Sequence, residues 1–257
     1  MDHLIGDYIS QGAQGAVYHA SEYFNKELTG VYGSQFVVKI IDYYTFIGPS
    51  VLDDNPLIDM RHILRTYEKV KPSVLPHVLP LVRWIVFFED GSSMDSVSHS
   101  ISDIGNRTPA KLLLVFPLLE GTIASQIDHM NVNQRKDVCL QMINIVRSLH
   151  AVGLTHGDLH MNNLMYRKLD SGYYHVFAID LDKAGLPGTK EQDYYDVCDY
   201  VARIMYRKAF ERCDEIKTKK QLYALLITLA MHTSSPRSRK EEALESLSDV
   251  FKNTTFE

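Results

Sequence analysis

The chain has few residues of the kinds that mark disulfide-rich, metal-binding or membrane proteins. Its 257 residues include only three cysteines, Cys139, Cys198 and Cys213, which form no CxxC pair and no zinc spacing. Free thiols in a reducing compartment are the simplest interpretation. No apolar run reaches membrane-spanning length, and no basic flank followed by an apolar run marks a secretory signal near Met1. We therefore expect a cytoplasmic protein without a membrane span.

An excess of positive charge is also absent. The chain has 27 Lys and Arg residues against 32 Asp and Glu, which gives a net charge of −5. This balance argues against a dedicated nucleic-acid-binding protein, which would usually be basic. The hydrophobic share of 45% and the charged share of 23% are ordinary for a globular protein. A chain of this length can form one large domain or two small lobes.

The first part of the sequence has the patterns of β-strands, with one helix among them. Two strand-like runs lie within residues 7–20 and are joined by a glycine-containing turn, and further β-branched or apolar runs occupy residues 35–41, 84–88 and 112–116. Residues 59–70 have helical spacing. Residues 90–109 are polar and rich in Ser, Asp and Gly, which indicates an exposed loop.

The second part has mainly helical patterns. Helices are predicted near residues 134–150, 194–210, 219–232 and 240–251, and two short strands near 164–166 and 174–179. We therefore expect an α+β fold with a β-rich N-terminal lobe, residues 1–118, and a helical C-terminal lobe, residues 119–257. The two lobes would form one domain, with a hinge at residues 117–121.

The segment from His156 to Asn163 has the residues that phosphoryl transfer requires. That reaction needs a carboxylate to orient the acceptor hydroxyl and metal ions to neutralise the triphosphate, and magnesium prefers oxygen ligands. His156, Asp158 and Asn163 complete the pattern HxDxxxxN. A lone HxD would more often be a polar loop that satisfies backbone amides. The full pattern and its flanks resemble the catalytic loop of the protein-kinase-like superfamily, which implies a bilobal fold and an ATP-dependent phosphotransferase.

A second candidate metal ligand ends the predicted strand at 174–179. Asp180 follows an apolar run and, with Leu181 and Asp182, resembles the kinase Asp-Phe-Gly triplet. If the chain stays extended there, Asp180 and Asp182 point to the same side and Asp182 helps to hold a metal. The alternative is that Asp182 is a solvated turn residue.

The N-terminal motifs follow in the order that the resemblance requires. Residues 10–17 resemble the kinase glycine-rich loop, with Ser10 in place of its first glycine, and glycines allow backbone amides to approach phosphates. The resemblance then implies ATP with Mg²⁺ or Mn²⁺. It implies catalytic roles for Asp158, Lys39 and His160, and metal ligation by Asn163 and Asp180. It places the nucleotide against Gly12, Ala13, Gln14, Gly15, Val17, Lys39, Pro117 and Leu118.

The chain departs from the kinase pattern at several positions. The acidic partner of Lys39 is left open between Asp59, Glu68 and none. His160 stands where kinases usually have a lysine, and it either touches the γ-phosphate or stabilises the loop. Asp196 resembles the buried aspartate that anchors the catalytic loop. The span before it is short and has no Ala-Pro-Glu, so an activating phosphosite at Thr189, Tyr194 or Tyr195 is not assigned.

Three functions follow from this pattern. The first is a minimal Ser/Thr protein kinase, of the kind seen among bacterial effectors and large DNA viruses, which would act in the host cytoplasm if secreted. The second is a small-molecule kinase, because His-Gly-Asp-Leu-His is common in aminoglycoside-phosphotransferase-like proteins. The third is a pseudokinase that binds partners. The expected partners are ATP and a hydroxyl acceptor, with an activating protein left open and no nucleic acid.

Overall fold

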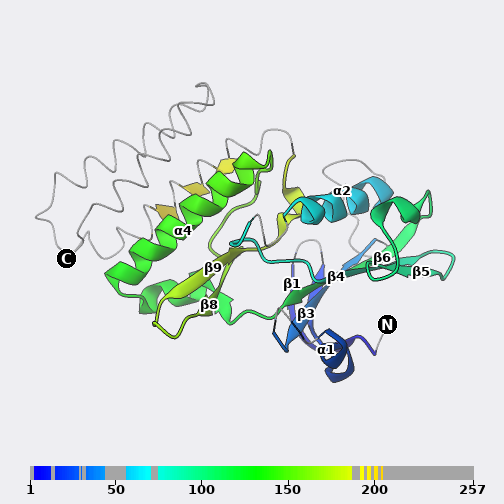
Figure 1. The fold of residues 1–257 in the computed structure, drawn as a ribbon, viewed down its shortest axis with the longest axis horizontal. Helices are drawn as coiled ribbons and strands as arrows, with labels where there is room; N and C mark the ends of the chain where they lie inside the picture. The colour runs from blue at the N-terminus through cyan, green and yellow to red at the C-terminus, as the bar shows by residue number, and fades with distance from the viewer. Residues whose placement is uncertain are drawn as a thin grey trace, which may run out of the picture. The chain divides into compact units, whose positions relative to one another are not determined.

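The computed structural model describes residues 3–12, 15–28, 30, 33–43, 56–70 and 75–186, together with residues 192, 193, 196, 197, 200, 201 and 204. The chain divides into two compact units (Figure 1). The first unit comprises Met1–Lys71 and Leu79–Leu118, and the second comprises Pro72–Val78 and Leu119–Glu257. The helices predicted beyond residue 210 lie outside the described residues, and the one at 194–210 is described only at a few positions.

The first unit is built on a six-stranded antiparallel sheet. Its strand order is β1-β2-β3-β6-β4-β5. The strands are β1 (Ile5–Gln11), β2 (Ala16–Ala20), β3 (Phe36–Asp42), β4 (Arg83–Phe88), β5 (Ser93–Asp95) and β6 (Pro109–Pro117). The strands that the apolar runs predicted are therefore present. β6 is buried along most of its length because it has a strand on each side and a helix over each face.

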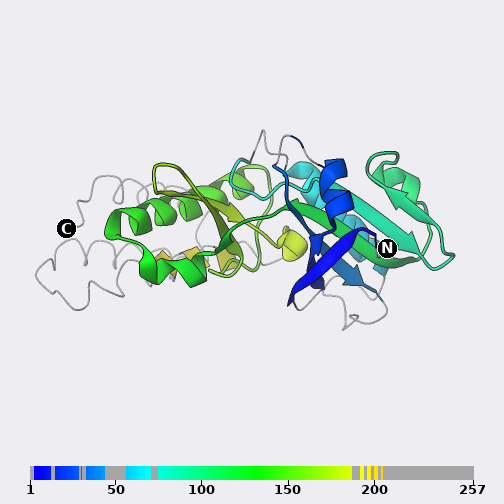
Figure 2. The ribbon, with the colours of Figure 1, turned by 90° about the horizontal axis from the view of Figure 1, so that it is seen from below.

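Two helices cover opposite faces of this sheet. In α2 (Pro56–Lys69), the ring of Tyr67 packs at a tilt against Phe116 of β6, with the ring centroids 5.3 Å apart. In α1 (Glu22–Leu28), Phe24 is fully buried and joins a core cluster with Leu113 and Val115 of β6. Since side chains alternate along a strand, Phe116 and Val115 lie on opposite faces. Figure 2 shows α1, in dark blue, beside the strands of the sheet.

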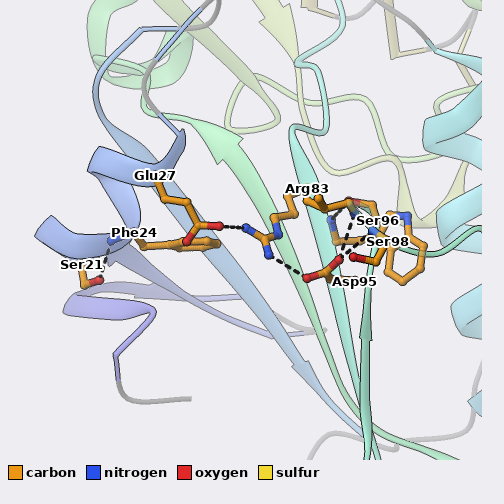
Figure 3. Close-up of polar contacts among 9 residues, drawn as sticks. Ser21, Phe24, Glu27, Arg83, Asp95, Ser96 and Ser98 are labelled. Carbon is orange, nitrogen blue, oxygen red and sulfur yellow. Dashed lines mark hydrogen bonds and ion pairs between the residues drawn. The ribbon is translucent and has the colours of Figure 1, made fainter.

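The side chain of Arg83 connects α1 to the sheet. Arg83 on β4 forms ion pairs with Glu27 of α1 and, at 2.7 Å, with Asp95 of β5 (Figure 3). Its guanidinium also lies over the ring of Phe24, 5.4 Å from the centroid. The Oγ of Ser21 accepts a hydrogen bond from the amide of Phe24 and so caps the first turn of α1. A cap, a buried aromatic side chain and a bridging cation thus fix this short helix.

The stretch 90–109 is not a simple exposed loop, so that prediction was wrong in part. It contains β5, which pairs with β4, and a 3-10 helix, η1 (Ile101–Ile104). Ile101 and Ile104 are buried, and η1 packs against α2, where Arg61 donates a hydrogen bond to the carbonyl of Gly105. Two apolar residues in a polar stretch are therefore enough to attach it to the core.

The second unit combines a long helix with a small sheet. The sheet has the order β7-β8-β9, with β7 (Gly121–Thr122), β8 (Leu164–Lys168) and β9 (Tyr174–Ala178). The helix α4 (Val132–Ala151) packs on β9, as Figure 1 shows. Short helical pieces complete the unit: α3 (Ile123–Gln126), η2 (Ile127–His129) and η3 (Leu181–Lys183). Cys139 of α4 is a buried free thiol whose pKa is raised by burial.

Both ends of α4 are closed by local hydrogen bonds. At the start, Asn131 and Gln134 form a capping box in which each side chain accepts a hydrogen bond from the backbone amide of the other. At the end, Gly153 adopts φ 74°. The amides of Gly153 and Leu154 donate to the carbonyls of His150 and Leu149, which is a Schellman motif. The glycine in the left-handed region therefore ends the helix and turns the chain into the loop at 154–163.

None of the helices in the described part of the chain combines the length and the apolar character needed to cross a lipid bilayer.

Candidate active site

The loop between α4 and β8 is held by one buried carboxylate. Asp193 is fully buried. Its Oδ2 accepts the amide of His156 at 2.8 Å and its Oδ1 accepts the amide of Gly157 at 2.7 Å. The Nε2 of His150, in the last turn of α4, lies 2.9 Å from the same Oδ2. A buried charge needs such donors, so Asp193 fixes the backbone directly before Asp158.

The sequence assigned this anchoring role to Asp196, and that assignment was wrong. Asp196 is only partly buried, and its side chain accepts a hydrogen bond from Gln192 at 2.7 Å. Burial raises the pKa of Asp196 to about 6, and the nearby carboxylates of Asp193 and Asp158 add to the rise. The error is less than one helical turn, because the sequence pattern alone does not fix which aspartate of the helix points to the loop.

Gly157 and His156, which directly precede Asp158, fix the backbone conformation of the loop at this point. Gly157 has φ 78°, in the left-handed region that favours glycine. His156 is fully buried, and burial lowers its pKa although Asp193, Asp180 and Asp158 lie near enough to oppose the effect. Its Nε2 lies 3.0 Å from the carbonyl of Ile179, so a neutral ring that donates from Nε2 fits this position. His156 therefore ties the loop to the residue before Asp180.

Asn163 and Asp180 lie next to each other at the ends of β8 and β9. The amide of Ile179 donates to the carbonyl of Asn163 at 3.0 Å. The side-chain Nδ2 of Asn163 donates to the carbonyl of Asp158 at 2.9 Å, which leaves its Oδ1 as the atom available to a ligand. The structure thus brings Asp158, Asn163 and Asp180 into one site, as the pattern requires.

Asp180 is the one described residue other than glycine with a positive φ. Its φ and ψ are 62° and 61°. A non-glycine residue in this region is strained, and such strain persists where the surroundings fix it and is frequent at functional sites. The strained residue lies between the end of β9 at Ala178 and the start of η3 at Leu181.

The oxygen atoms at this site suit a magnesium ion. An amide oxygen of Asn163 and the carboxylate of Asp180 are the hard ligands that Mg²⁺ takes, and it usually keeps several waters and binds substrate phosphates besides. The described residues contain no group of three or more His, Cys, Asp or Glu side chains that would form an all-protein metal cage. The donor set therefore fits a metal that arrives with a nucleotide.

Both earlier interpretations of Asp182 need correction. The chain is not extended after Asp180 but forms η3, so the two carboxylates do not alternate as in a strand. Asp182 is also not a solvated turn residue, because it is buried with 5% of its surface exposed. A polar residue in a short turn is expected to be exposed, whereas Asp182 is buried.

The positive charge beside Asp158 comes from a residue that the sequence did not single out. The Nζ of Lys183, in η3, donates a hydrogen bond to Oδ2 of Asp158 at 2.9 Å. His160 instead closes the loop: its Nδ1 accepts the amide of Asn163 at 3.2 Å, and its carbonyl accepts the same amide at 2.8 Å. The loop-stabilising alternative for His160 is therefore what the contacts support.

The predicted nucleotide-binding residues of the first unit lie in the turn between β1 and β2, on β2 and β3, and at the end of β6. The amide of Gly12 donates to the carbonyl of Gly15 at 2.8 Å and closes the hairpin. A side chain at Gly15 would clash with the carbonyl of Ile40, since an added Cβ would lie 2.3 Å from its oxygen. Val17 and Lys39 are direct partners across β2 and β3. Ala13 and Gln14 lie outside the described residues.

Packing and hydrogen bonds within the sheet account for the identity or position of some of these residues without any ligand. Gly15 is required by the close approach of β3, and the amide of Leu118 already donates to the carbonyl of Gln35 at 2.9 Å. Pro117 pairs with Phe36 at the end of β6. Any contact of Leu118 with a base would therefore involve its carbonyl or side chain.

The two candidates for the acidic partner of Lys39 differ in burial. Lys39 alternates with Val38, which faces α1, and so lies on the face that α2 covers. On α2, Asp59 is partly buried and its pKa is raised by burial, against the opposing charge of His62. Glu68 is exposed. A carboxylate at the packed face is the better candidate, so of the alternatives left open by the sequence we favour Asp59.

Comparison with known proteins gives one matching family and a matching solved structure. A family model described as the lipopolysaccharide kinase (Kdo/WaaP) family matches residues 118–197. The solved structure of a divergent kinase lacking the glycine-rich loop, described as regulating membrane ultrastructure of the Toxoplasma parasitophorous vacuole, matches with a TM-score of 0.56 and 15% identity. That match covers 93% of this chain and 80% of the other. No curated protein matches the sequence.

The chain therefore has a protein-kinase-like fold, and the predicted α+β architecture is confirmed. The matched family and the matched structure together support the protein-kinase-like superfamily that the motifs resemble. The family match spans the loop around Asp158, both metal-ligand candidates and Asp193.

Proposed function

We propose that this protein is an ATP-dependent phosphotransferase that transfers the γ-phosphate of ATP to the hydroxyl of a serine or threonine in a protein. The observation that carries the proposal is the shared site of Asp158, Asn163 and Asp180, with its loop held by Asp193. The family match over residues 118–197 supports a kinase. The pattern of a glycine turn, Lys39, Asp158 and Asp180 in kinase order supports the protein acceptor.

The chemistry assigns one task to each residue. The acceptor oxygen forms a bond to the γ-phosphorus, the bond from that phosphorus to the bridging oxygen breaks, and ADP leaves with the electron pair. Asp158 orients the hydroxyl and takes its proton. Asn163 and Asp180 would hold a magnesium ion, which neutralises phosphate charge. Lys39 would bind phosphate oxygens, and the turn at Gly12 and Gly15, with Val17, Pro117 and Leu118, would enclose the nucleotide.

A saccharide or other small-molecule hydroxyl is the second candidate acceptor. The observation that favours it is the family match, since the matching family is one of lipopolysaccharide kinases. The short span between Asp182 and Asp193 leaves little chain for a peptide-docking segment. The two acceptors use the same Asp158 chemistry, so only the identity of the hydroxyl separates them.

Transfer from labelled ATP distinguishes these functions. The full chain is incubated with Mg²⁺ and, in separate reactions, with a mixed protein substrate and with lipopolysaccharide or aminosugar acceptors. We expect label on protein Ser or Thr, and expect Asp158→Asn to reduce it by about two to four orders of magnitude while nucleotide binding persists. Label on the sugar alone would favour the second candidate. Nucleotide binding without any Asp158-dependent transfer would leave a pseudokinase.

A further inference from the structure

The hydrogen bond between Lys183 and Asp158 places a cation directly on the proposed base. The Nζ of Lys183 lies 2.9 Å from Oδ2 of Asp158, and the two side chains are 39% and 40% exposed. An ammonium group has three donors, and this bond uses one. Lys183 follows Asp180 within η3, so the element that presents the metal-ligand candidate also presents this charge. The pair is thus open to solvent and to a substrate.

His160 is engaged elsewhere in the loop. Its Nδ1 accepts the amide of Asn163 at 3.2 Å, and its carbonyl accepts the same amide at 2.8 Å. The ring of His160 therefore closes the turn from residue 160 to 163. The loop from His156 to Asn163 contains no lysine. Within the described part of the chain, Lys183 forms an ion pair with Asp158.

We propose that Lys183 takes over the task of the missing catalytic-loop lysine. It is a catalytic residue: one N–H holds the Asp158 carboxylate toward the acceptor hydroxyl, and the other two donate to oxygens of the phosphoryl group as it moves from ADP to the acceptor. The ammonium keeps its own proton throughout, because the acceptor proton goes to Asp158. The inference rests on the proposed function, and it names a residue that the catalytic loop itself does not contain.

The exposure of the pair makes the idea testable without loss of folding. An exposed ion pair contributes little to stability. A charge aimed at the transferring group is worth far more to the rate, since removal of one such donor costs roughly 100- to 1,000-fold in kcat. A purely structural role for Lys183 therefore predicts a small change in both quantities, whereas a role in transfer predicts a large change in kcat alone.

The test compares Lys183→Met with Lys168→Met, which removes an exposed lysine of β8 in the same unit. For Lys183→Met we expect kcat to fall on the order of 100-fold. Its thermal midpoint and its Kd for a non-hydrolysable ATP analogue with Mg²⁺ should stay close to the wild-type values. Lys183→Arg should retain more activity than the Met variant. The control variant should match the wild type in all three measurements.

A double variant tests whether a lysine placed in the catalytic loop can replace Lys183. Adding His160→Lys to Lys183→Met returns a cation to the catalytic loop, and we expect it to recover at least tenfold in kcat. An unchanged kcat in Lys183→Met, with an active wild type, overturns this inference alone. A fall in kcat that merely follows a lost thermal midpoint also overturns it. If the wild type shows no Asp158-dependent transfer, the proposed function fails and the inference fails with it.

Discussion

Asp193 shows how much of the candidate site depends on a single side chain. Its carboxylate has no exposed surface, and its two oxygens accept hydrogen bonds from the amides of His156 and Gly157 and contact the ring of His150. These contacts join the end of α4 to the turn that presents Asp158. The aspartate is therefore a structural part of the catalytic loop although it is distant from it in sequence.

Replacement of this residue should cost stability as well as activity. Asp193→Asn keeps the size of the side chain but replaces one acceptor oxygen by a donor that faces a backbone N–H. We expect a loss of about 3 kcal/mol in the free energy of unfolding, in the range found when a buried charge partner is removed. Denaturant unfolding followed by circular dichroism measures the loss. A variant as stable as the wild type would contradict the anchoring role.

The neighbouring Asp196 should behave in the opposite way. Burial raises the pKa of Asp196 to about 6, above the value of about 4 expected in the unfolded chain. The folded protein thus holds this proton more tightly, and the resulting stability is present below pH 4 and is lost as the pH rises through 6. Asp196→Asn should therefore be more stable than the wild type at pH 7 and nearly equal to it at pH 4. Thermal midpoints of both proteins between pH 4 and 7 measure this difference.

At the scale of elements, α1 is a short helix whose place depends on its packing. Isolated helices of this length are not stable in water, and α1 is fixed by the Ser21 cap, the Arg83 ion pairs and the burial of Phe24. The helix covers one face of the sheet, and the side chains of Phe36 and Val38 under it belong to the same core cluster. The strand that carries Lys39 is thus held from the opposite side.

Two adjacent residues of α1 give a matched test. Phe24 is fully buried and Tyr23 is 67% exposed. Phe24→Ala should lower the free energy of unfolding by about 3–5 kcal/mol, because a large core side chain is lost and a cavity remains. Tyr23→Ala, on the same helix, should change it by about 0.5 kcal/mol or less. Similar effects of the two substitutions would show that α1 does not anchor the sheet.

The sequence predicted most of the strands and the helices α2 and α4, and it missed α1, β5, β7, α3 and the 3-10 helices. β3 and β6 are continuous apolar runs and α4 has helical spacing over many residues, so their patterns outweigh local noise. By contrast, α1 and η1 contain few apolar residues, and only tertiary contacts of Phe24 and Ile104 reveal them. A propensity-based argument sums over a window, and a single anchoring side chain contributes little to that sum.

The residues of the site also fall into two groups: some are predicted from their spacing along the chain, and others depend on contacts with residues distant in sequence. Asp158, Asn163 and Asp180 were predicted because their spacing along the chain is characteristic. Asp193 and Lys183 were missed, since their roles follow from contacts with residues far away in sequence. The glycine of His-Gly-Asp did carry a usable signal, because a turn that places two amides on one carboxylate requires the left-handed φ of Gly157.

At the scale of the whole molecule, nucleotide and metal should stabilise the protein together. A ligand that binds only the folded state raises its stability, by about 2.7 kcal/mol at 100 times Kd. We expect ATP with Mg²⁺ to raise the thermal midpoint more than ATP alone. Asp180→Asn should abolish that metal-dependent difference, because it removes a carboxylate ligand. Asp170→Asn, in the exposed turn after β8, serves as the control and should keep the difference. A full metal-dependent rise in Asp180→Asn would exclude Asp180 as a ligand.

The contacts of Asp193 also have a consequence for protein synthesis. The chain leaves the ribosome from its N-terminus, so α4 and the His156–Asn163 loop emerge before the residue whose carboxylate holds them. Until Asp193 is outside the exit tunnel, the amides of His156 and Gly157 lack their acceptor. The two hydrogen bonds that hold the loop in its final conformation therefore cannot form. A nascent chain that stops short of this residue would contain Asp158, Asn163 and Asp180, the residues of the proposed site, but would lack the carboxylate that holds their loop. Competence for phosphoryl transfer would thus arise late, after most of the strands have already formed.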